Sequence, residues 1–322
     1  MASLLQFQDL EPTVEAMREE VVRGLRQTPK QLSAKFLYDG PGALLYENIC
    51  RTEDYYLTRT ELAIMRDHIA AIAACLGEKA LLIEFGSGNS LKTRVLFDHL
   101  PRLAGYVPID ISRRQLLETS ENIARDYPHI EVLPVCADYA GEVEIPSPAS
   151  PFSRRLIYYP GSTIGNMVPR DAVNFLRRMR GLCQPGDALL IGVDLRKDPE
   201  IVWRAYNDRD GASTRFRMNI LQRMNRELGA DFAISQFRPV AVYNEVVCRV
   251  EAGLMSLCDQ QARIGDELFS FNEGELVQLA VAYKYSPEGF RDLALEAGWR
   301  AEQLWTDERN WFSVQYLTAM TS

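Results

Sequence analysis

The chain has 322 residues, of which 47% are hydrophobic and 25% charged, and it carries a formal net charge of −8. These values are typical of a folded protein and exclude a disordered or low-complexity chain. The negative charge, without any dense run of Lys or Arg, argues against nucleic acid as a partner. At this length we expect one large domain or two intertwined domains.

The N-terminus and the content of cysteine and histidine narrow the class of protein further. The first twenty residues lack a basic segment and a long apolar run, so we expect no secretory signal. No run approaches the roughly 20 apolar residues of a membrane span, and we expect a cytoplasmic protein without a membrane partner. The six cysteines have no C-x2-C spacing and the three histidines form no cluster, which predicts reduced thiols and no metal site.

From residue 80 onward, short apolar runs alternate with amphipathic helical patterns. The helical patterns include residues 112–127 and 170–182. The apolar runs predict strands at 80–85, 105–110, 130–135, 155–160 and 188–195. Strands that alternate with helices form βαβ units, so this region predicts a parallel sheet covered by helices on both faces.

The alternation stops after residue 196. A polar helical region follows, then β-like runs at 238–257 and 275–286, and the alternation resumes at 287–319 with a helix and two strands. We therefore predict that residues 61–196 and 285–322 form a sheet domain. Residues 1–60, rich in helix formers, are expected to pack with the insertion 197–284 as a second domain.

The segment "EFGSGNS" at 84–90 follows the first of these predicted strands. A strand that passes through a glycine turn into a helix commonly holds a nucleotide-like cofactor. Gly86 and Gly88 are followed by Leu91, where a dinucleotide fingerprint has its third glycine, and Lys92 does not fit the spacing of a P-loop. S-adenosylmethionine is the remaining common cofactor for such a turn.

Polar residues at the ends of the next two predicted strands agree with this cofactor. Asp110 ends the strand 105–110 and suits the ribose hydroxyls, and Asp138 with Tyr139 in "CADY" suits the adenine amine and ring. Each aspartate alone would be an ordinary turn former or helix cap. Together they line the edge where open α/β sheets bind ligands, which favours a cofactor site.

Five longer motifs extend this interpretation over nearly the whole chain. They are "FLYDGPGALLYENIC" at 36–50, "EDYYLTRTE" at 53–61, "EFGSGNSLKT" at 84–93, "PGSTIGNM" at 160–167 and "WRAYNDRDG" at 203–211. With them the chain resembles the histidine-specific Nα-methyltransferases of ergothioneine biosynthesis. The resemblance implies an α/β fold with a Rossmann-like S-adenosylmethionine methyltransferase sheet and a second α+β domain built from the N-terminal segment and the insertion. We expect a monomer that acts on a small-molecule amino acid.

The resemblance also implies the residues of the site. Cofactor contacts are expected from Gly86, Ser87, Gly88, Lys92, Asp110, Asp138, Tyr139 and Gly161. Around the acceptor, the hydroxyls of Tyr56 and Tyr206 are expected to donate to the carboxylate, and the oxygen of Asn166 to accept from the amine. The products would be S-adenosylhomocysteine and an N-methylated amino acid, for which the family favours trimethylation.

The acceptor pocket departs from the family pattern. Histidine-specific members place a glutamate and, two residues later, a serine before a Lys-aromatic pair, and a methionine in R-[VI]-E-M. These positions hold Ala280, Ala282 and Ala252 here, and the pocket is also expected to include Tyr38 and Tyr46. Each unmet hydrogen bond of a buried imidazole costs roughly 1–3 kcal/mol. Histidine is therefore expected to be a poor acceptor, and tryptophan or an indole-substituted tryptophan a better one.

Other interpretations stay open from the sequence. One is an L-histidine Nα-trimethyltransferase that makes hercynine for ergothioneine. Another is a methyltransferase of secondary metabolism that acts on an indole ring atom or a small amine. A binding protein that keeps only the cofactor fold is disfavoured, because Tyr56, Asn166 and Tyr206 are all present.

Overall fold

The computed structural model describes residues 7–100, 102–139, 141 and 143–321, which divide into two compact units. The first, which we call the sheet unit, contains residues 7–11, 57–196 and 283–321 of the described chain. The second, which we call the insertion unit, contains residues 12–56 and 197–282. Each unit is therefore assembled from segments that are far apart in the sequence.

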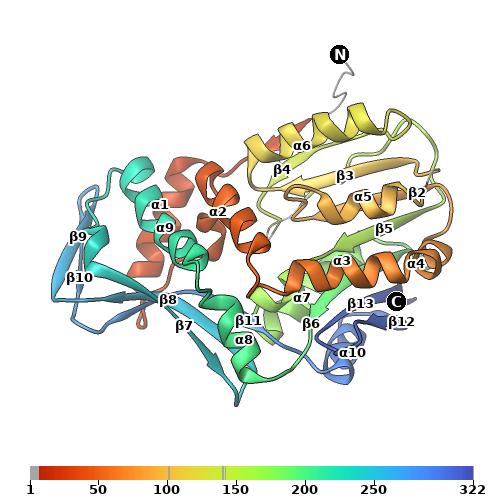
Figure 1. Cartoon of the computed structure of the whole chain (residues 1–322). Helices are drawn as coiled ribbons and strands as arrows, with labels where there is room; N and C mark the ends of the chain where they lie inside the picture. The colour runs from red at the N-terminus through yellow and green to blue at the C-terminus, as the bar shows by residue number, and fades with distance from the viewer. Residues whose placement is uncertain (1–6, 101, 140, 142, 322) are drawn as a thin grey trace. The chain divides into compact units, whose positions relative to one another are not determined.

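The sheet unit is built on an eight-stranded sheet (Figure 1). Its strand order is β1-β4-β3-β2-β5-β6-β13-β12, and all neighbouring pairs are parallel except those made by β13. The strands are β1 (Gln8–Leu10), β2 (Ala80–Phe85), β3 (Gly105–Asp110), β4 (Val135–Ala137), β5 (Arg154–Tyr159), β6 (Ala188–Asp194), β12 (Trp299–Thr306) and β13 (Phe312–Ala319). The predicted α/β fold class is confirmed.

Continuous burial explains why the central strands were readable from the sequence. Every residue of β2 and β6 is buried, as expected for parallel strands that helices cover on both faces. The order of strands reverses at β2, whose neighbours are β3 on one side and β5 on the other. Ligands of open α/β sheets bind beyond the carboxyl ends of the strands at such a switch point.

Six helices belong to the described part of the sheet unit; α6 packs on β3, and the other five form two groups. Helices α3, α4 and α5 contact one another, and α3 also packs on β13, whereas α7 packs with α10 (Figure 1). The helices are α3 (Leu57–Asp67), α4 (Ile69–Leu76), α5 (Leu91–Phe97), α6 (Arg113–Asp126), α7 (Pro169–Gly181) and α10 (Pro287–Glu296). Helices α7 and α10 begin with proline in the first turn, where its missing N–H costs nothing.

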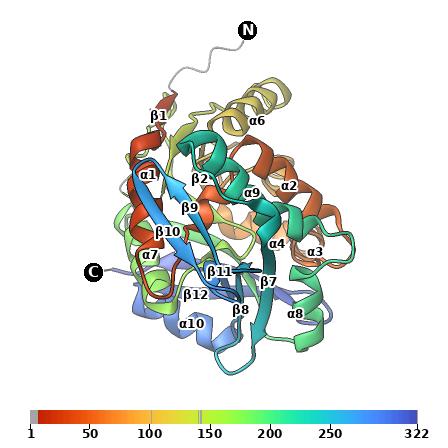
Figure 2. The same cartoon turned by 90° about the vertical axis from the view of Figure 1, so that its left-hand side faces the viewer.

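The insertion unit combines four helices with a three-stranded and a two-stranded sheet (Figure 2). The helices are α1 (Val14–Leu25), α2 (Gly40–Arg51), α8 (Pro199–Tyr206) and α9 (Ala212–Leu228). The larger sheet has the order β11-β8-β7, from β7 (Phe237–Asn244), β8 (Arg249–Ser256) and β11 (Leu276–Tyr283), and β9 (Gln260–Ile264) pairs with β10 (Glu267–Phe271). The two chain segments of the insertion unit meet where Leu32 N donates to Gln278 O at 2.8 Å and where α2 packs on α9.

Three details differ from the sequence prediction. Residues 7–11, 57–60 and 283–284, expected in the second domain, belong to the sheet unit. Residues 7–11 do so because β1 pairs in parallel with β4. The strand expected at 130–135 is regular only from Val135, although Val132 already forms an isolated bridge with Tyr106 of β3. The ladder is interrupted between these two pairings, where Pro108 and Pro134 both lack an N–H. Strands β9 and β10 were not predicted.

Helices long and apolar enough to cross a bilayer are absent from the described residues.

Candidate functional site

The turn after β2 has the backbone conformation that its glycines predict. Gly86 and Gly88 have φ of +74° and +49°, which is the left-handed region that favours glycine. The N–H groups of Gly86 and Ser87 donate to Ile109 O at 2.8 and 3.2 Å. A Cβ atom at Gly86 would lie 3.3 Å from the Tyr139 hydroxyl. The turn is therefore fixed to the end of β3, with its backbone open to close approach.

Asp110, at the end of β3, organises the same turn. Its two carboxylate oxygens accept hydrogen bonds from Gly88 N and Ser112 N, each at 2.9 Å. Burial raises the pKa of Asp110, although these backbone donors act in the opposite direction. A carboxylate offers about four lone-pair sites, so each oxygen retains room for a further donor such as a ribose hydroxyl.

Asp138 and Tyr139 follow β4 directly, and both are half-buried. The Tyr139 ring packs edge-to-face on Phe85, with 5.8 Å between the ring centroids. Burial raises the pKa of the Tyr139 phenol, which therefore stays protonated. The structure thus places the two residues on consecutive strand ends with Asp110, in an arrangement that suits an adenosine moiety.

Ser87 provides a direct test of whether this turn fits a polar ligand. The residue is 5% exposed, and its hydroxyl has no hydrogen-bond partner among the described residues. A buried hydroxyl without a partner is uncommon and costly. With the open glycine backbone and the spare capacity of Asp110, this hydroxyl fits the polar methionine end of S-adenosylmethionine.

Lys92 and Gly161 both contact Glu61, a residue that the sequence did not identify. The Lys92 ammonium lies 2.5 Å from a carboxylate oxygen of Glu61, and Gly161 N donates to both oxygens of Glu61 at 3.1 and 3.0 Å. Glu61 is fully buried. Because the Gly161 N–H is used by Glu61, the expected contact of Gly161 with the cofactor would involve its other atoms.

Asn166 ends a short 3-10 helix, Thr163–Asn166, after β5, and its side chain is exposed. Asp194 N donates to the hydroxyl of Ser162 at 2.9 Å and so holds the start of this helix. The Asp194 carboxylate also pairs with Lys284 at 2.6 Å, and both side chains are buried. The lysine of the Lys-aromatic pair therefore anchors the segment that carries Asn166.

Tyr56, in the insertion unit, lies beside a lysine that was not predicted. The Lys197 ammonium donates to the Tyr56 hydroxyl at 2.7 Å and lies 4.5 Å from the ring centroid. The tyrosine is only 1% exposed. Because its oxygen accepts from a cation, the Tyr56 O–H proton is directed away from Lys197, as donation to a carboxylate would require.

Tyr38, Tyr46 and Tyr206 belong to one aromatic group, which also contains Tyr55 and Phe216. Tyr38 and Tyr46 each pack on Phe216, with centroids 5.3 and 5.7 Å apart, and Tyr55 packs on Tyr206 at 6.5 Å. The hydroxyls of Tyr46 and Tyr55 are 3.3 Å apart. Burial raises the pKa of both phenols. Tyr46 and Tyr55 therefore offer neutral hydroxyls, and the group as a whole offers ring faces.

Two of the three alanines lie close to Tyr206. Ala282, on β11, belongs to a buried apolar cluster against which Tyr206 and Ala252 pack. Ala252, on β8, is paired with Ala241 on β7. Ala280 precedes Ala282 by two residues on the same strand, so it faces the same side of the sheet, and it is half-buried. The surroundings of Tyr206 on this sheet face are therefore apolar.

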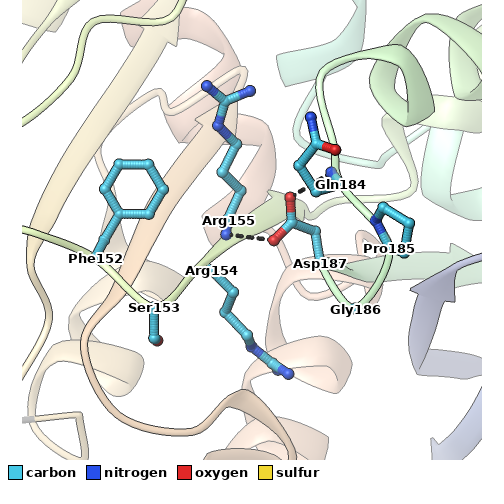
Figure 3. A pocket seen from close by; sticks show the side chains of 8 residues that line it. All are labelled: Phe152, Ser153, Arg154, Arg155, Gln184, Pro185, Gly186 and Asp187. Carbon is cyan, nitrogen blue, oxygen red and sulfur yellow. Dashed lines mark hydrogen bonds between the residues drawn. The ribbon is translucent and has the colours of Figure 1, made fainter.

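A hollow at the opposite edge of the sheet is a weaker candidate (Figure 3). It is lined by residues just before or at the start of β5 and β6, at the amino ends of these strands. Its buried carboxylate, Asp187, already accepts from Arg155 N and Gln184 N at 2.8 and 2.7 Å. These bonds fix two loops, and the hollow lies away from the edge where such sheets bind ligands.

Comparison with known proteins agrees with the geometry of the glycine turn. The family model described as "Histidine-specific methyltransferase, SAM-dependent" matches residues 17–319. The chain is 38% identical over 306 residues to the histidine N-alpha-methyltransferase of Mycobacterium tuberculosis, covering 93% of this chain and 94% of that protein. It is 37% identical over 318 residues to the protein of the same name from Mycolicibacterium smegmatis, covering 97% and 98%.

A more distant relative is the 4-dimethylallyltryptophan N-methyltransferase of Claviceps purpurea, which is 24% identical over 325 residues and covers 91% of this chain and 92% of that protein. The family match extends over both units, and the relatives are matched over nearly their full length. The protein is thus an S-adenosylmethionine-dependent N-methyltransferase, and it belongs to the family of histidine-specific, SAM-dependent methyltransferases.

Proposed function

We propose that the protein methylates the α-amine of a free aromatic amino acid. The observation that carries this proposal is the match to enzymes named as N-alpha-methyltransferases over nearly their full length. Support from the site comes from Tyr56 and Tyr206, whose phenols suit a carboxylate, and from the exposed amide of Asn166, which suits an amine.

In this proposal the protein acts mainly by alignment. The bound cofactor supplies an electrophilic methyl group on a sulfonium that is already a good leaving group. The two tyrosine hydroxyls donate to the acceptor carboxylate, and the Asn166 oxygen accepts from the amine and directs its lone pair. Holding the reacting atoms in line is the chief contribution. Water takes the released proton, so no dedicated general base is required.

The acceptor we propose is tryptophan or an indole-substituted tryptophan. The supporting observation is the apolar surface beside Tyr206, to which Ala252 and Ala282 contribute. An indole buries a large apolar area and has a single N–H, whereas an imidazole needs partners for two ring nitrogens. Methyl groups at these positions supply neither a donor nor an acceptor.

Histidine is the second candidate, and the comparisons favour it over tryptophan. The relatives at 38% and 37% identity carry the histidine name, whereas the relative named for a prenylated tryptophan is 24% identical. The structural observation and the comparisons therefore point to different acceptors, and one assay separates them.

The assay offers purified protein and S-adenosylmethionine one acceptor at a time: histidine, tryptophan, 4-substituted tryptophans, tyrosine and phenylalanine. Mass spectrometry counts the methyl groups and fragment ions place them on the α-nitrogen or on the ring. Methylated tryptophan without methylated histidine supports the indole proposal. Trimethylated histidine alone overturns it in favour of the second candidate. Ring methylation, or no product from any free amino acid, overturns α-amine methylation.

A further inference from the structure

Glu61 is a fully buried carboxylate that contacts both Lys92 and Gly161. It lies on α3, its exposed fraction is 0%, and it pairs with Lys92 on α5 at 2.5 Å. The N–H of Gly161, after β5, donates to both of its oxygens. One carboxylate therefore joins α3 to two segments on which cofactor contacts are expected.

The packing around Glu61 leaves its carboxylate little freedom. A Cβ atom at Gly192, on β6, would lie 2.2 Å from Glu61 Oε1. The carboxylate thus fits against a strand position without a side chain, and the Gly161 N–H fixes its other side. A buried charge held in this way needs a cation nearby, and Lys92 supplies it.

Lys92 retains the capacity to bind a second group. An ammonium has three N–H donors, and its lysine side chain is 16% exposed, whereas Glu61 is enclosed. Its nitrogen lies 3.2 Å from the position of a Cβ atom at Gly161. Lys92 is also four residues beyond Gly88, in the first turn of α5. The ammonium is therefore fixed beside Gly161 with donors that Glu61 does not use.

We propose that Glu61 is a positioning residue that directs the Lys92 ammonium to the carboxylate of the cofactor's methionine end. Without Glu61 the long lysine side chain would sample several rotamers and would lose binding free energy when it became ordered. With Glu61 the ammonium is already in place. The proposal concerns the cofactor alone, so it does not depend on which acceptor the enzyme methylates.

The test compares two ligands that differ at this end. S-adenosylhomocysteine has the amino-acid end, whereas 5′-methylthioadenosine has the same adenosine thioether without it. Isothermal titration calorimetry measures both ligands on the wild type and on Glu61→Gln, whose amide oxygen can still accept from Gly161 N–H. We expect the variant to bind S-adenosylhomocysteine at least about tenfold more weakly and methylthioadenosine within about twofold of the wild type.

A double-mutant cycle separates positioning from an independent effect. Lys92→Met should show the same selective loss, and the double variant should bind S-adenosylhomocysteine no more weakly than Lys92→Met alone. Asp126→Asn is the matched control, because it breaks an exposed ion pair with α5. Asp126, on α6, pairs with Arg94, which lies on α5 like Lys92. The control should leave both affinities unchanged.

Equal weakening of both ligands in Glu61→Gln, or additive losses in the double variant, would overturn the proposal and leave Glu61 a purely structural residue. Should Glu61→Gln fail to fold, as judged by circular dichroism, Lys92→Met decides alone. If Lys92→Met binds the two ligands in the wild-type ratio, the ammonium does not contact the amino-acid end and the proposal is wrong. No acceptor is present in these titrations, so failure of the proposed function would not alter their outcome.

Discussion

Asn166 is a side chain whose surroundings agree with a role in acceptor binding instead of folding. It is exposed at the end of its short helix, while Ser162 and Asp194 hold the beginning of that helix. The hydrogen bond that holds this helix is therefore made by Ser162 and Asp194, whereas the amide proposed to bind the acceptor belongs to Asn166. A change confined to the Asn166 amide should leave the segment intact.

Asn166→Ala tests this separation. We expect S-adenosylhomocysteine to bind within about twofold of the wild type, while turnover of the acceptor falls by about 100-fold or more because the amine is no longer oriented. Calorimetry and a mass-resolved rate assay measure the two quantities. Asn174→Ala, at an exposed position on α7, is the control. A variant with normal turnover would remove Asn166 from the acceptor site.

Glu84, the first residue of the glycine-turn motif and part of β2, makes stability depend on pH. Burial raises the pKa of this carboxyl from 4.5 to about 8, despite hydrogen bonds from Tyr106 and Thr93. Between these values the unfolded chain has released a proton that the folded protein retains, so the free energy of unfolding falls as the pH rises. This contribution is fully present below pH 4.5 and lost above pH 8.

Glu84→Gln should remove that dependence. From pH 6 to pH 8 we expect the wild type to lose roughly 2 kcal/mol more unfolding free energy than the variant. Urea unfolding without ligand, at closely spaced pH values, gives both curves. Parallel curves would show that Glu84 titrates normally in the folded protein.

The site residues differ in how readily the sequence identifies them. Gly86, Asp110 and Asp138 follow apolar runs, so their places at strand ends can be predicted locally. Glu61 cannot be identified in this way, because its partner Gly161 is 100 residues distant in the chain. Lys197 is likewise separated from Tyr56 by 141 residues. Such contacts depend on how the elements pack, which a local pattern does not contain.

Among the elements, β2 and β3 can be predicted from the local sequence, whereas β1 and the β9–β10 hairpin cannot. Strands β2 and β3 were predicted with their observed bounds because their apolar runs are buried from end to end or nearly so. The three residues of β1 are half-buried or exposed, and they form a strand only by pairing with β4. In β9 and β10 buried and exposed residues alternate over only five residues each.

Strand β6 has a glycine, Gly192, at a position where a side chain would clash with its neighbours, and Gly192→Ala tests this close packing. The new Cβ atom would meet Glu61 Oε1 at 2.2 Å and the Phe312 ring at 3.0 Å. We expect the variant to lose about 1–3 kcal/mol of unfolding free energy, measured by urea unfolding. Gly181→Ala, in α7, is the control because its Cβ would meet nothing within 4 Å. Equal stability of the two variants would contradict the close packing of β6.

For the molecule as a whole, the two units contain different parts of the proposed binding site. The proposed cofactor contacts lie in the sheet unit, whereas Tyr56, Tyr206 and the three alanines lie in the insertion unit. Each unit has its own buried core. Cofactor binding should therefore stabilise the sheet unit most directly.

Hydrogen exchange with mass spectrometry measures this for the full chain. With saturating S-adenosylhomocysteine we expect slower amide exchange at residues 85–92 and at the ends of β3 and β4. Exchange in β9 and β10 should change little, because that hairpin contains no proposed contact. Protection that is as strong in the hairpin as in the glycine turn would contradict a cofactor site confined to the sheet unit.

The position of β13 has a consequence for how the protein is made. This strand begins at residue 312 but pairs with β6, which ends at residue 194, and it separates β6 from β12. While a ribosome synthesises the intervening residues, one edge of an apolar strand has no partner in the nascent chain. Unpaired apolar edges are where chains associate with one another. Aggregation during expression should therefore arise from incomplete chains, and slower synthesis or chaperones that cover this edge should raise the yield of folded enzyme.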